Sequence, residues 1–213
     1  MMDALRDNLI AKLGRETFAR VQETRIGIAG AGGLGSNCAA NLVRIGFRRL
    51  TIIDFDTVDP SNLDRQFFFA DQVGMHKVEA LAQNLLRINP DLDLSVHLRR
   101  LGKSMFAQAF TGCGIVAECL DTAECKSALV SELLPLGKLL VAVSGLGGFG
   151  SSDEIRVHVL RENLVVIGDL RSDIATKPAL SPRVAIAAAK QADVILSHVS
   201  GRLSRIPGIS MTE

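Results

Sequence analysis

The feature that most constrains this chain is a glycine-rich turn between an apolar strand and an apolar helix. The turn reads GAGGLG at residues 30–35 and follows the apolar run at residues 26–29. A second apolar run, at residues 50–53, ends on Asp54. A strand, a glycine turn, a helix and a strand closing on an acid are typical of a mononucleotide-binding βαβ unit. The pattern predicts an α/β, Rossmann-like fold with a mainly parallel sheet flanked by helices.

Each part of this unit has a physical role in holding a nucleotide. Gly30 permits the tight turn, Gly32 lets a phosphate approach the backbone, and Gly35 allows the helix to pack closely on the strand. The helix N-terminus offers free N–H groups to anionic oxygens, and Asp54 can accept hydrogen bonds from a ribose. The motif does not name the nucleotide, and a purely structural glycine turn is the alternative.

Composition limits the other classes of function. The chain has 213 residues, 47% of them apolar, and a net charge of +1, which favours one domain over residues 1–213. This charge gives no indication of a nucleic-acid or membrane surface. Neither a signal peptide nor an apolar run of about 18 residues is found, so we expect a soluble cytoplasmic protein.

The four cysteines lack the paired C-x-x-C spacing of a structural zinc, and Cys38 and Cys119 are expected to be buried, inert side chains.

Hydrophobic periodicity divides the chain into an N-terminal segment, a core and a C-terminal part. We expect an N-terminal helix within residues 1–22, a Rossmann-like core over 25–144, a mobile loop and short strands over 145–180, and a late apolar helix over 181–200. Within the last two parts, runs 155–160 and 164–167 predict an antiparallel pair, and residues 202–213 a loose tail. Inside the core, the expected helices cover residues 72–88, 101–110 and 122–136, and the expected strands cover 93–98, 114–120 and 138–144.

Charged side chains follow the strand ends that would share one edge of the sheet. Asp121 ends an apolar run, and Arg65 and Lys77 lie in and after the polar loop that leaves Asp54. Two cations beside one acid suit a triphosphate with Mg²⁺ better than a nicotinamide, because cations and metal stabilise charge that develops on phosphate oxygens. The structural alternative is that the two cations are surface charges and that Asp121 caps a helix.

The string DFDTVDPSNLDRQ, preceded by GAGGLGS and followed by VGMHKVEA, resembles the ThiF/MoeB/HesA family, the bacterial relatives of ubiquitin-activating enzymes. The resemblance covers residues 25–121 strongly and 182–199 more weakly. It implies a homodimer that binds ATP and Mg²⁺, adenylates the C-terminal glycine carboxylate of a small ubiquitin-like sulfur carrier, and releases pyrophosphate. Because residues 126–213 contain no cysteine, the chain looks like a short ThiF type, with a ThiS-like carrier and a role in thiamine thiazole biosynthesis.

The resemblance also assigns roles to single residues. It places Asp54 at the ribose, Asp121 at Mg²⁺ and the reaction, and an N-terminal arginine, Arg6 with Arg15 as second choice, at the ATP of the neighbouring subunit. Two positions depart from the family pattern, because Asp121 is followed by threonine rather than asparagine and Lys126 replaces an arginine. The remaining implied contacts are with the phosphates: Gly30, Gly32, Gly33, Gly35, Asn62, Arg65, Gln66 and Lys77.

Two other functions stay open at this point. Asp54 after the glycine turn also suits an NAD-dependent oxidoreductase. The altered residue after Asp121 and the missing cysteines also suit a scaffold that binds the carrier without catalysis. Binding of NAD, or carrier binding without pyrophosphate release, would support these alternatives.

Overall fold

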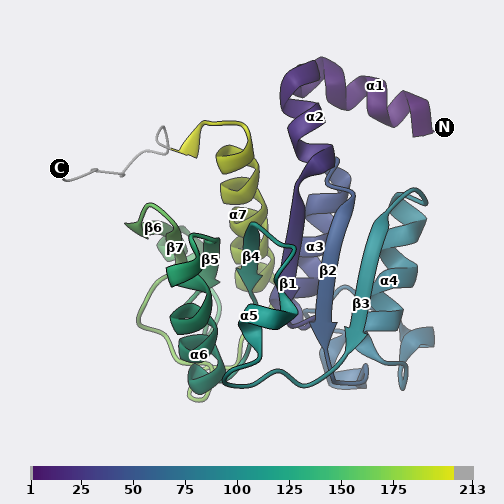
Figure 1. Ribbon diagram of the computed structural model, residues 1–213. Coiled ribbons are helices and arrows are strands. Elements are labelled where there is room, and N and C mark those ends of the chain that lie inside the picture. Colours follow the sequence, from purple (N-terminus) through teal and green to yellow (C-terminus); the bar gives the residue numbers. More distant parts are fainter. Residues whose placement is uncertain (1, 204–213) are drawn as a thin grey trace.

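The computed structural model describes residues 2–203, with side chains from residue 4 onward, and its centre is a single seven-stranded sheet (Figure 1). The strand order is β3-β2-β1-β4-β5-β7-β6, and every neighbouring pair is parallel except β6 with β7. The predicted α/β fold and the antiparallel pair near the C-terminus are therefore confirmed. The strands are β1 (Arg25–Ala29), β2 (Arg49–Asp54), β3 (Asp93–Leu98), β4 (Ile115–Glu118), β5 (Leu139–Val143), β6 (Arg156–Arg161) and β7 (Leu164–Gly168).

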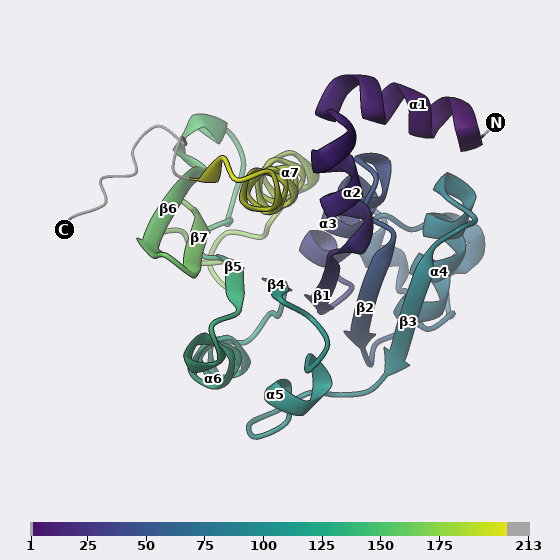
Figure 2. The same ribbon diagram turned by 45° about the horizontal axis from the view of Figure 1, so that its top comes forward.

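Helices cover both faces of the sheet, as Figures 1 and 2 show. On one face lie α3 (Gly33–Arg44), α4 (Lys77–Ile88) and α7 (Ser181–Val199), and on the other lie α5 (Phe106–Ala109) and α6 (Ala123–Leu133). Successive strand residues point to opposite faces, so Ile28 joins the first apolar cluster and Ala29 the second. The buried apolar strands are thus explained by the two helical layers that cover them.

The N-terminal segment is two helices, α1 (Met2–Leu13) and α2 (Arg15–Glu23), rather than the single predicted helix. Gly14 separates them with a left-handed φ of +80°, a conformation that glycine adopts readily. The break was missed because apolar residues keep helical spacing on both sides of it. Figure 2 shows α1 projecting away from the body of the molecule.

Two further helix predictions were too long. The helix expected over 72–88 begins at Lys77, because Ala70–Gln72 form a 3₁₀ turn and Gly74 has a φ of +90°. The helix expected over 101–110 is reduced to Phe106–Ala109, which follows Ser104 with a φ of +68°. Glu132 of α6 accepts the Phe106 N–H at 3.0 Å, a tertiary contact that periodicity does not reveal.

The glycine-rich segment after β5 packs against the loop that follows β7. A Cβ atom at Gly147 would lie 2.7 Å from the carbonyl oxygen of Asp173, and Gly148 forms a β-bridge with Ala179. The mobility expected for this segment stays a prediction. None of the helices within residues 2–203 is both long and apolar enough to cross a membrane. The predicted tail lies outside the described residues from residue 204 onward.

Candidate nucleotide-binding site

The order of the strands in the sheet reverses between β1 and β4, because β2 and β3 follow on one side of β1, and β4 and β5 lie on the other. Ligands of open α/β sheets bind outside the carboxyl ends of strands at such a switch point. The two strand ends are in contact here, because a Cβ atom at Gly30 would lie only 2.6 Å from the Cys119 carbonyl oxygen. The predicted glycine turn after β1 and the predicted acid after β4 therefore follow adjacent strand ends at the same edge of the sheet.

The glycine turn has the geometry predicted for Gly30 and Gly35. Gly30 has a φ of +97°, and a Cβ atom at Gly35 would lie 1.8 Å from the Gly30 carbonyl oxygen, so both positions require glycine. Gly32 differs, because the one atom near its built Cβ is Gln66 Nε2, 3.9 Å away. The open space at Gly32 is where a phosphate is predicted to approach the backbone.

The N-terminus of α3 is open to an anionic ligand. Its N-cap is Gly32, which supplies no side-chain hydrogen bond, and the first N–H groups of any helix have no acceptor within the helix. These groups carry the positive end of the helix dipole. A helix N-terminus beside an open glycine is the arrangement used to hold phosphate oxygens.

Asp54 holds the glycine turn in shape. Its Oδ2 accepts the Ala31 N–H at 2.6 Å and its Oδ1 accepts the Asp56 N–H at 2.7 Å. The residue is only 9% exposed. Sequence reasoning missed this structural role. The contact of Asp54 with a ribose stays a prediction, and it is compatible with these two hydrogen bonds because a carboxylate oxygen can accept a second one.

The structure brings the end of the polar loop to the glycine turn, as predicted. The Arg65 carbonyl oxygen would lie 3.6 Å from a Cβ atom at Gly33, and it accepts a 3.0 Å hydrogen bond from Asn37. The Gln66 side chain lies beside Gly32, and its Oε1 is buried without a hydrogen-bond partner within the described residues. A buried polar atom without a partner costs about 1–3 kcal/mol, so the Gln66 Oε1 calls for a polar partner such as a ligand or a water.

The two predicted cations are tethered to the same loop. Lys77 Nζ donates to Asp56 Oδ2 at 2.9 Å and its side chain is 8% exposed, so its interpretation as a surface charge is wrong. Arg65 Nη1 donates to Ser61 O at 2.9 Å and to Asp64 Oδ1 at 2.6 Å. Each cation has further N–H groups beyond these contacts, with which it can bind a phosphate.

Asn62 has a structural role that the sequence prediction did not include. Its Oδ1 accepts the Asp59 N–H at 3.1 Å, while Asp59 Oδ1 accepts the Ser61 N–H at 2.9 Å. Hydrogen bonds from the Ser61 hydroxyl and N–H lower the pKa of Asp59 below its usual value. These reciprocal bonds fix the short turn Pro60–Asn62. The amide nitrogen of Asn62 remains a predicted phosphate contact.

Asp121 lies in the turn after β4, and its interpretation as a helix cap is wrong. The N-cap of α6 is Thr122, whose hydroxyl accepts the Cys125 N–H at 3.4 Å. Asp121 is exposed, and no hydrogen bond or ion pair of its carboxylate is found within residues 2–203. The same residues hold no group of three or more potential metal ligands. A single exposed carboxylate fits Mg²⁺ that is held mainly by phosphates and water.

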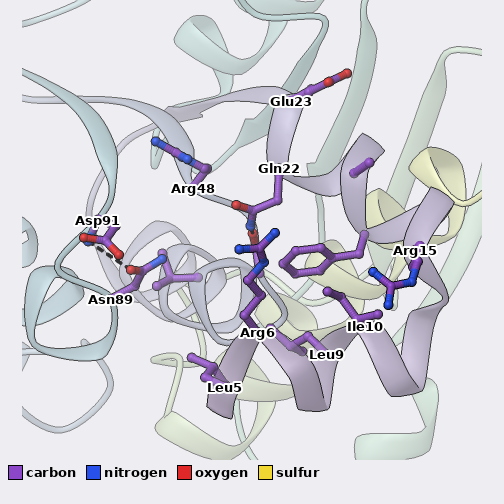
Figure 3. Close-up of a pocket in the computed structure, with 14 residues that line it drawn as sticks. Leu5, Arg6, Leu9, Ile10, Arg15, Gln22, Glu23, Arg48, Asn89 and Asp91 are labelled. Atoms are coloured by element: carbon purple, nitrogen blue, oxygen red, sulfur yellow. Dashed lines mark hydrogen bonds between the residues drawn. The ribbon is translucent and has the colours of Figure 1, made fainter. Parts of the chain in front are cut away.

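Arg6 and Arg15 lie at the opposite edge of the sheet from the glycine turn. They line a cavity of about 510 Å³ between the N-terminal helices and the amino ends of the strands (Figure 3). Arg48 and Asp91, next to the starts of β2 and β3, line the same cavity. Neither N-terminal arginine is therefore part of the site of its own chain, and a contact with a neighbouring subunit stays a prediction.

The two cysteines expected to be inert, Cys38 and Cys119, are both buried. Burial raises the pKa of the Cys38 thiol to about 12 and that of Cys119 well above its usual value. A thiol in this environment is a poor nucleophile because the reactive thiolate is disfavoured. The prediction for both residues is confirmed.

A buried ion pair at the same edge was not predicted. Arg183 Nη2 of α7 lies 2.5 Å from Asp169 Oδ2 after β7, and the two side chains are 4% and 5% exposed. Burial works to raise the pKa of Asp169, but N–H groups of Ser172 and Arg171 and the charge of Arg183 outweigh it and lower the pKa to about 2. Arg183 also donates to the Gly150 carbonyl oxygen at 3.1 Å. The only sequence signal is an acid directly after an apolar strand, and its partner is not indicated.

The glycine turn, the open helix N-terminus and the adjoining strand ends define a Rossmann-like nucleotide-binding domain. More narrowly, the chain belongs to the ThiF family, whose model matches residues 5–202. It is 31% identical over 151 residues to the SUMO-activating enzyme subunit 2 of Dictyostelium discoideum, covering 70% of this chain and 23% of that protein. It is 33% identical over 157 residues to ubiquitin-like modifier-activating enzyme 5 of Oryza sativa subsp. japonica, covering 68% of this chain and 36% of the relative.

The fold is also similar to solved structures. Escherichia coli TcdA, a tRNA N6-threonylcarbamoyladenosine dehydratase solved with AMP, matches with a TM-score of 0.80 and 21% identity over 93% of each chain. At this identity the likeness shows the fold alone. The chain spans about a quarter to a third of the length of the curated relatives named above.

Proposed function

We propose that this chain is an ATP-dependent adenylyltransferase that activates the C-terminal glycine carboxylate of a small, ThiS-like sulfur carrier in thiamine thiazole biosynthesis. The observation that carries the proposal is the open α3 N-terminus beside the unpartnered Gln66 Oε1, at the switch point of the sheet. Membership of the ThiF family supports it. So do relatives whose names describe activation of ubiquitin-like proteins and a fold neighbour solved with ATP.

The proposed reaction needs positioning and charge rather than a protein nucleophile. The α3 N-terminus with Gly32 holds phosphate oxygens, and Asp54 accepts a hydrogen bond from a ribose hydroxyl. Asp121 would hold Mg²⁺, which would neutralise phosphate charge. A carrier carboxylate oxygen attacks the α-phosphorus, the bond from that phosphorus to the bridging oxygen breaks, and pyrophosphate leaves. Arg65 and Lys77 stabilise the charge that grows on the leaving group.

The loops beside the site suit a protein substrate. The glycine-rich segment and the loop after β7 expose large apolar side chains, with Phe149 81% exposed. Leu170 and Ile174 are each nearly half exposed on the neighbouring loop. Exposed apolar groups that gather on adjacent loops indicate an interaction surface. Gly150 of the first loop has open space around it, which leaves room for an extended C-terminal tail.

The proposed enzyme is a homodimer. Arg6 lies on α1 at the edge opposite the nucleotide site, so it can contribute only to the site of another subunit. A two-fold arrangement that brings α1 of one subunit to the carboxyl edge of the other meets this requirement.

The decisive test is ATP–pyrophosphate exchange with and without a small carrier protein that ends in Gly-Gly. We expect exchange that requires the carrier and that is abolished in Asp121→Ala and in Arg65→Ala. Arg20→Ala is the matched control, because Arg20 forms an exposed ion pair with Glu16 far from the site. Unchanged exchange in both site variants would contradict the assigned roles.

Two other results would replace the proposal. Carrier binding by protein that binds ATP, without any exchange, would favour the scaffold function. A larger rise in melting temperature with NAD than with ATP and Mg²⁺ would favour the oxidoreductase, because only a ligand that prefers the folded state stabilises it.

A further inference from the structure

The sheet opens between β4 and β5 at its carboxyl edge. The two strands pair from Ile115 with Leu139 to Ala117 with Val141, and their pairing then ends. Each strand continues on its other side, since β4 still pairs with β1 at Glu118 and β5 with β7 at Val143. The opening lies directly before the turn that carries Asp121, so something must hold the two strand ends in place.

From one face of the sheet, Gln191 of α7 joins the separated strands. Its Nε2 donates to the Glu118 carbonyl oxygen at 3.2 Å and to the Val141 carbonyl oxygen at 2.9 Å. The residue is fully buried, at 0% exposure. The bond to Glu118 satisfies a backbone acceptor just beyond the last β4–β5 pair, and the bond to Val141 reaches the last paired residue of β5. Together they explain a buried glutamine in an apolar helix.

From the other face, Lys126 of α6 makes the corresponding connection. Its Nζ lies 3.0 Å and 2.8 Å from the two carboxylate oxygens of Glu118, and 3.2 Å from the Val143 carbonyl oxygen. The Glu118 side chain is 1% exposed. An ammonium group has three donors, and these three acceptors account for them. Lys126 is therefore not available as a further cation for phosphate.

The same carboxylate also fixes the turn that leads to Asp121. Glu118 Oε1 accepts the Leu120 N–H at 2.7 Å, directly before Asp121 in the chain. A charge-assisted bond to a buried carboxylate is stronger than an ordinary one, so the conformation of this turn depends on the position of Glu118. That position depends in turn on Lys126.

We propose that Lys126, Glu118 and Gln191 form a polar bridge across the opening between β4 and β5, and that Lys126 and Glu118 are positioning residues for Asp121. The inference rests on the proposed role of Asp121 in the reaction. It assigns no new contact with ATP or carrier to the bridge. Its effect is to hold Asp121 at a fixed place in the turn after β4, at the carboxyl edge of the sheet.

The test compares two lysines that both donate to backbone carbonyls. Lys138 lies just before β5 and donates to the Phe110 carbonyl oxygen at 3.1 Å, near the opposite edge of the sheet. Lys126→Met and Lys138→Met therefore remove similar side chains at the two ends of β5. Lys126→Arg keeps the charge and serves as the conservative rescue. All variants are assayed at a temperature where circular dichroism shows them folded.

We expect Lys126→Met to lower kcat for carrier-dependent exchange about 10- to 100-fold, as small displacements of a reacting group do, while KM for ATP changes little. It should also raise the Mg²⁺ concentration needed for half-maximal exchange. Lys126→Arg should restore most of kcat, and Lys138→Met should keep it within about twofold of wild type. Equal losses in the two methionine variants, or an unchanged kcat in Lys126→Met, would overturn the inference.

A second readout needs no activity. Amide hydrogen exchange should show the Leu120 amide protected in the wild type and in Lys138→Met, and exchanging at least tenfold faster in Lys126→Met. Absence of carrier-dependent exchange in the wild type would reject the proposed function alone. Unaltered protection of Leu120 in folded Lys126→Met would reject the polar bridge.

Discussion

The two edges of the sheet differ in what they offer a ligand. The amino edge has a cavity of about 510 Å³ beneath Arg6, Arg15 and Arg48, and its lining mixes these cations with Glu23 and Asp91. The carboxyl edge has backbone N–H groups without an acceptor in their own helix and a glycine, Gly32, that leaves room for a ligand. The open α3 N-terminus and the buried Gln66 Oε1 are both at this edge. Orphaned hydrogen-bonding groups, rather than volume, therefore locate the candidate site.

The most direct test of this comparison adds a methyl group to each of two glycines in the same turn, in separate variants. Gly35→Ala places a Cβ atom 1.8 Å from the Gly30 carbonyl oxygen, which backbone atoms cannot relieve without shifting α3 from β1. We expect a loss of at least about 3 kcal/mol in the free energy of unfolding, at the upper end for overpacked positions. Urea denaturation measures it, and a loss below about 1 kcal/mol would contradict the close packing.

Gly32→Ala is the matched variant, and it should act on the ligand instead. Its Cβ enters open space, 3.9 Å from Gln66 Nε2, and the residue has a φ of −75° that alanine accepts. The free energy of unfolding should stay within about 0.5 kcal/mol of wild type. The methyl group occupies the predicted path of a phosphate, so ATP affinity in calorimetry should fall about 100-fold. Unchanged ATP affinity in Gly32→Ala would show that the phosphates do not bind at this turn.

Acidification should loosen the buried pair at the carboxyl edge. The pKa of Asp169 is lowered from 3.8 to about 2, so the ionised carboxylate contributes stability that is present above pH 4 and lost as the pH falls toward 2. The contribution is about 2 kcal/mol. The double variant Asp169→Asn with Arg183→Gln removes both charges. Urea unfolding at pH 6 and pH 3 should show a smaller decrease for the variant than for wild type, and equal decreases would contradict the assignment.

The sequence was sufficient to predict the parallel core, the glycine turn and the strand ends that meet at the site, because all follow from local periodicity and strand direction. Prediction from the sequence failed where a contact with a residue far away in the chain, or a choice between two adjacent residues, determines the local structure. Gly14 breaks a periodic helix, and Glu132 of α6 caps the shortened α5. Thr122 rather than Asp121 caps α6, a choice between two good capping residues that composition does not settle. The cationic partners of the buried acids Glu118 and Asp169 lie on helices that only the folded chain brings near.

Removing one cation from each edge of the sheet should change ATP affinity by different, smaller amounts. Lys77→Met removes a buried ammonium that is held 2.9 Å from Asp56 in the loop after β2, and it should weaken ATP binding about tenfold. Arg48→Met removes a cation from the large cavity at the other edge and should change ATP affinity by less than about twofold, because salt screens charges separated by more than about 10 Å. Calorimetry at 0.15 M salt compares the two. If Arg48→Met weakened ATP as much as Lys77→Met, the cavity would have to be a nucleotide site, and the orphaned groups at the carboxyl edge would need another ligand. A difference that persists at 0.5 M salt would place Lys77 in direct contact with the nucleotide, since only close pairs resist screening.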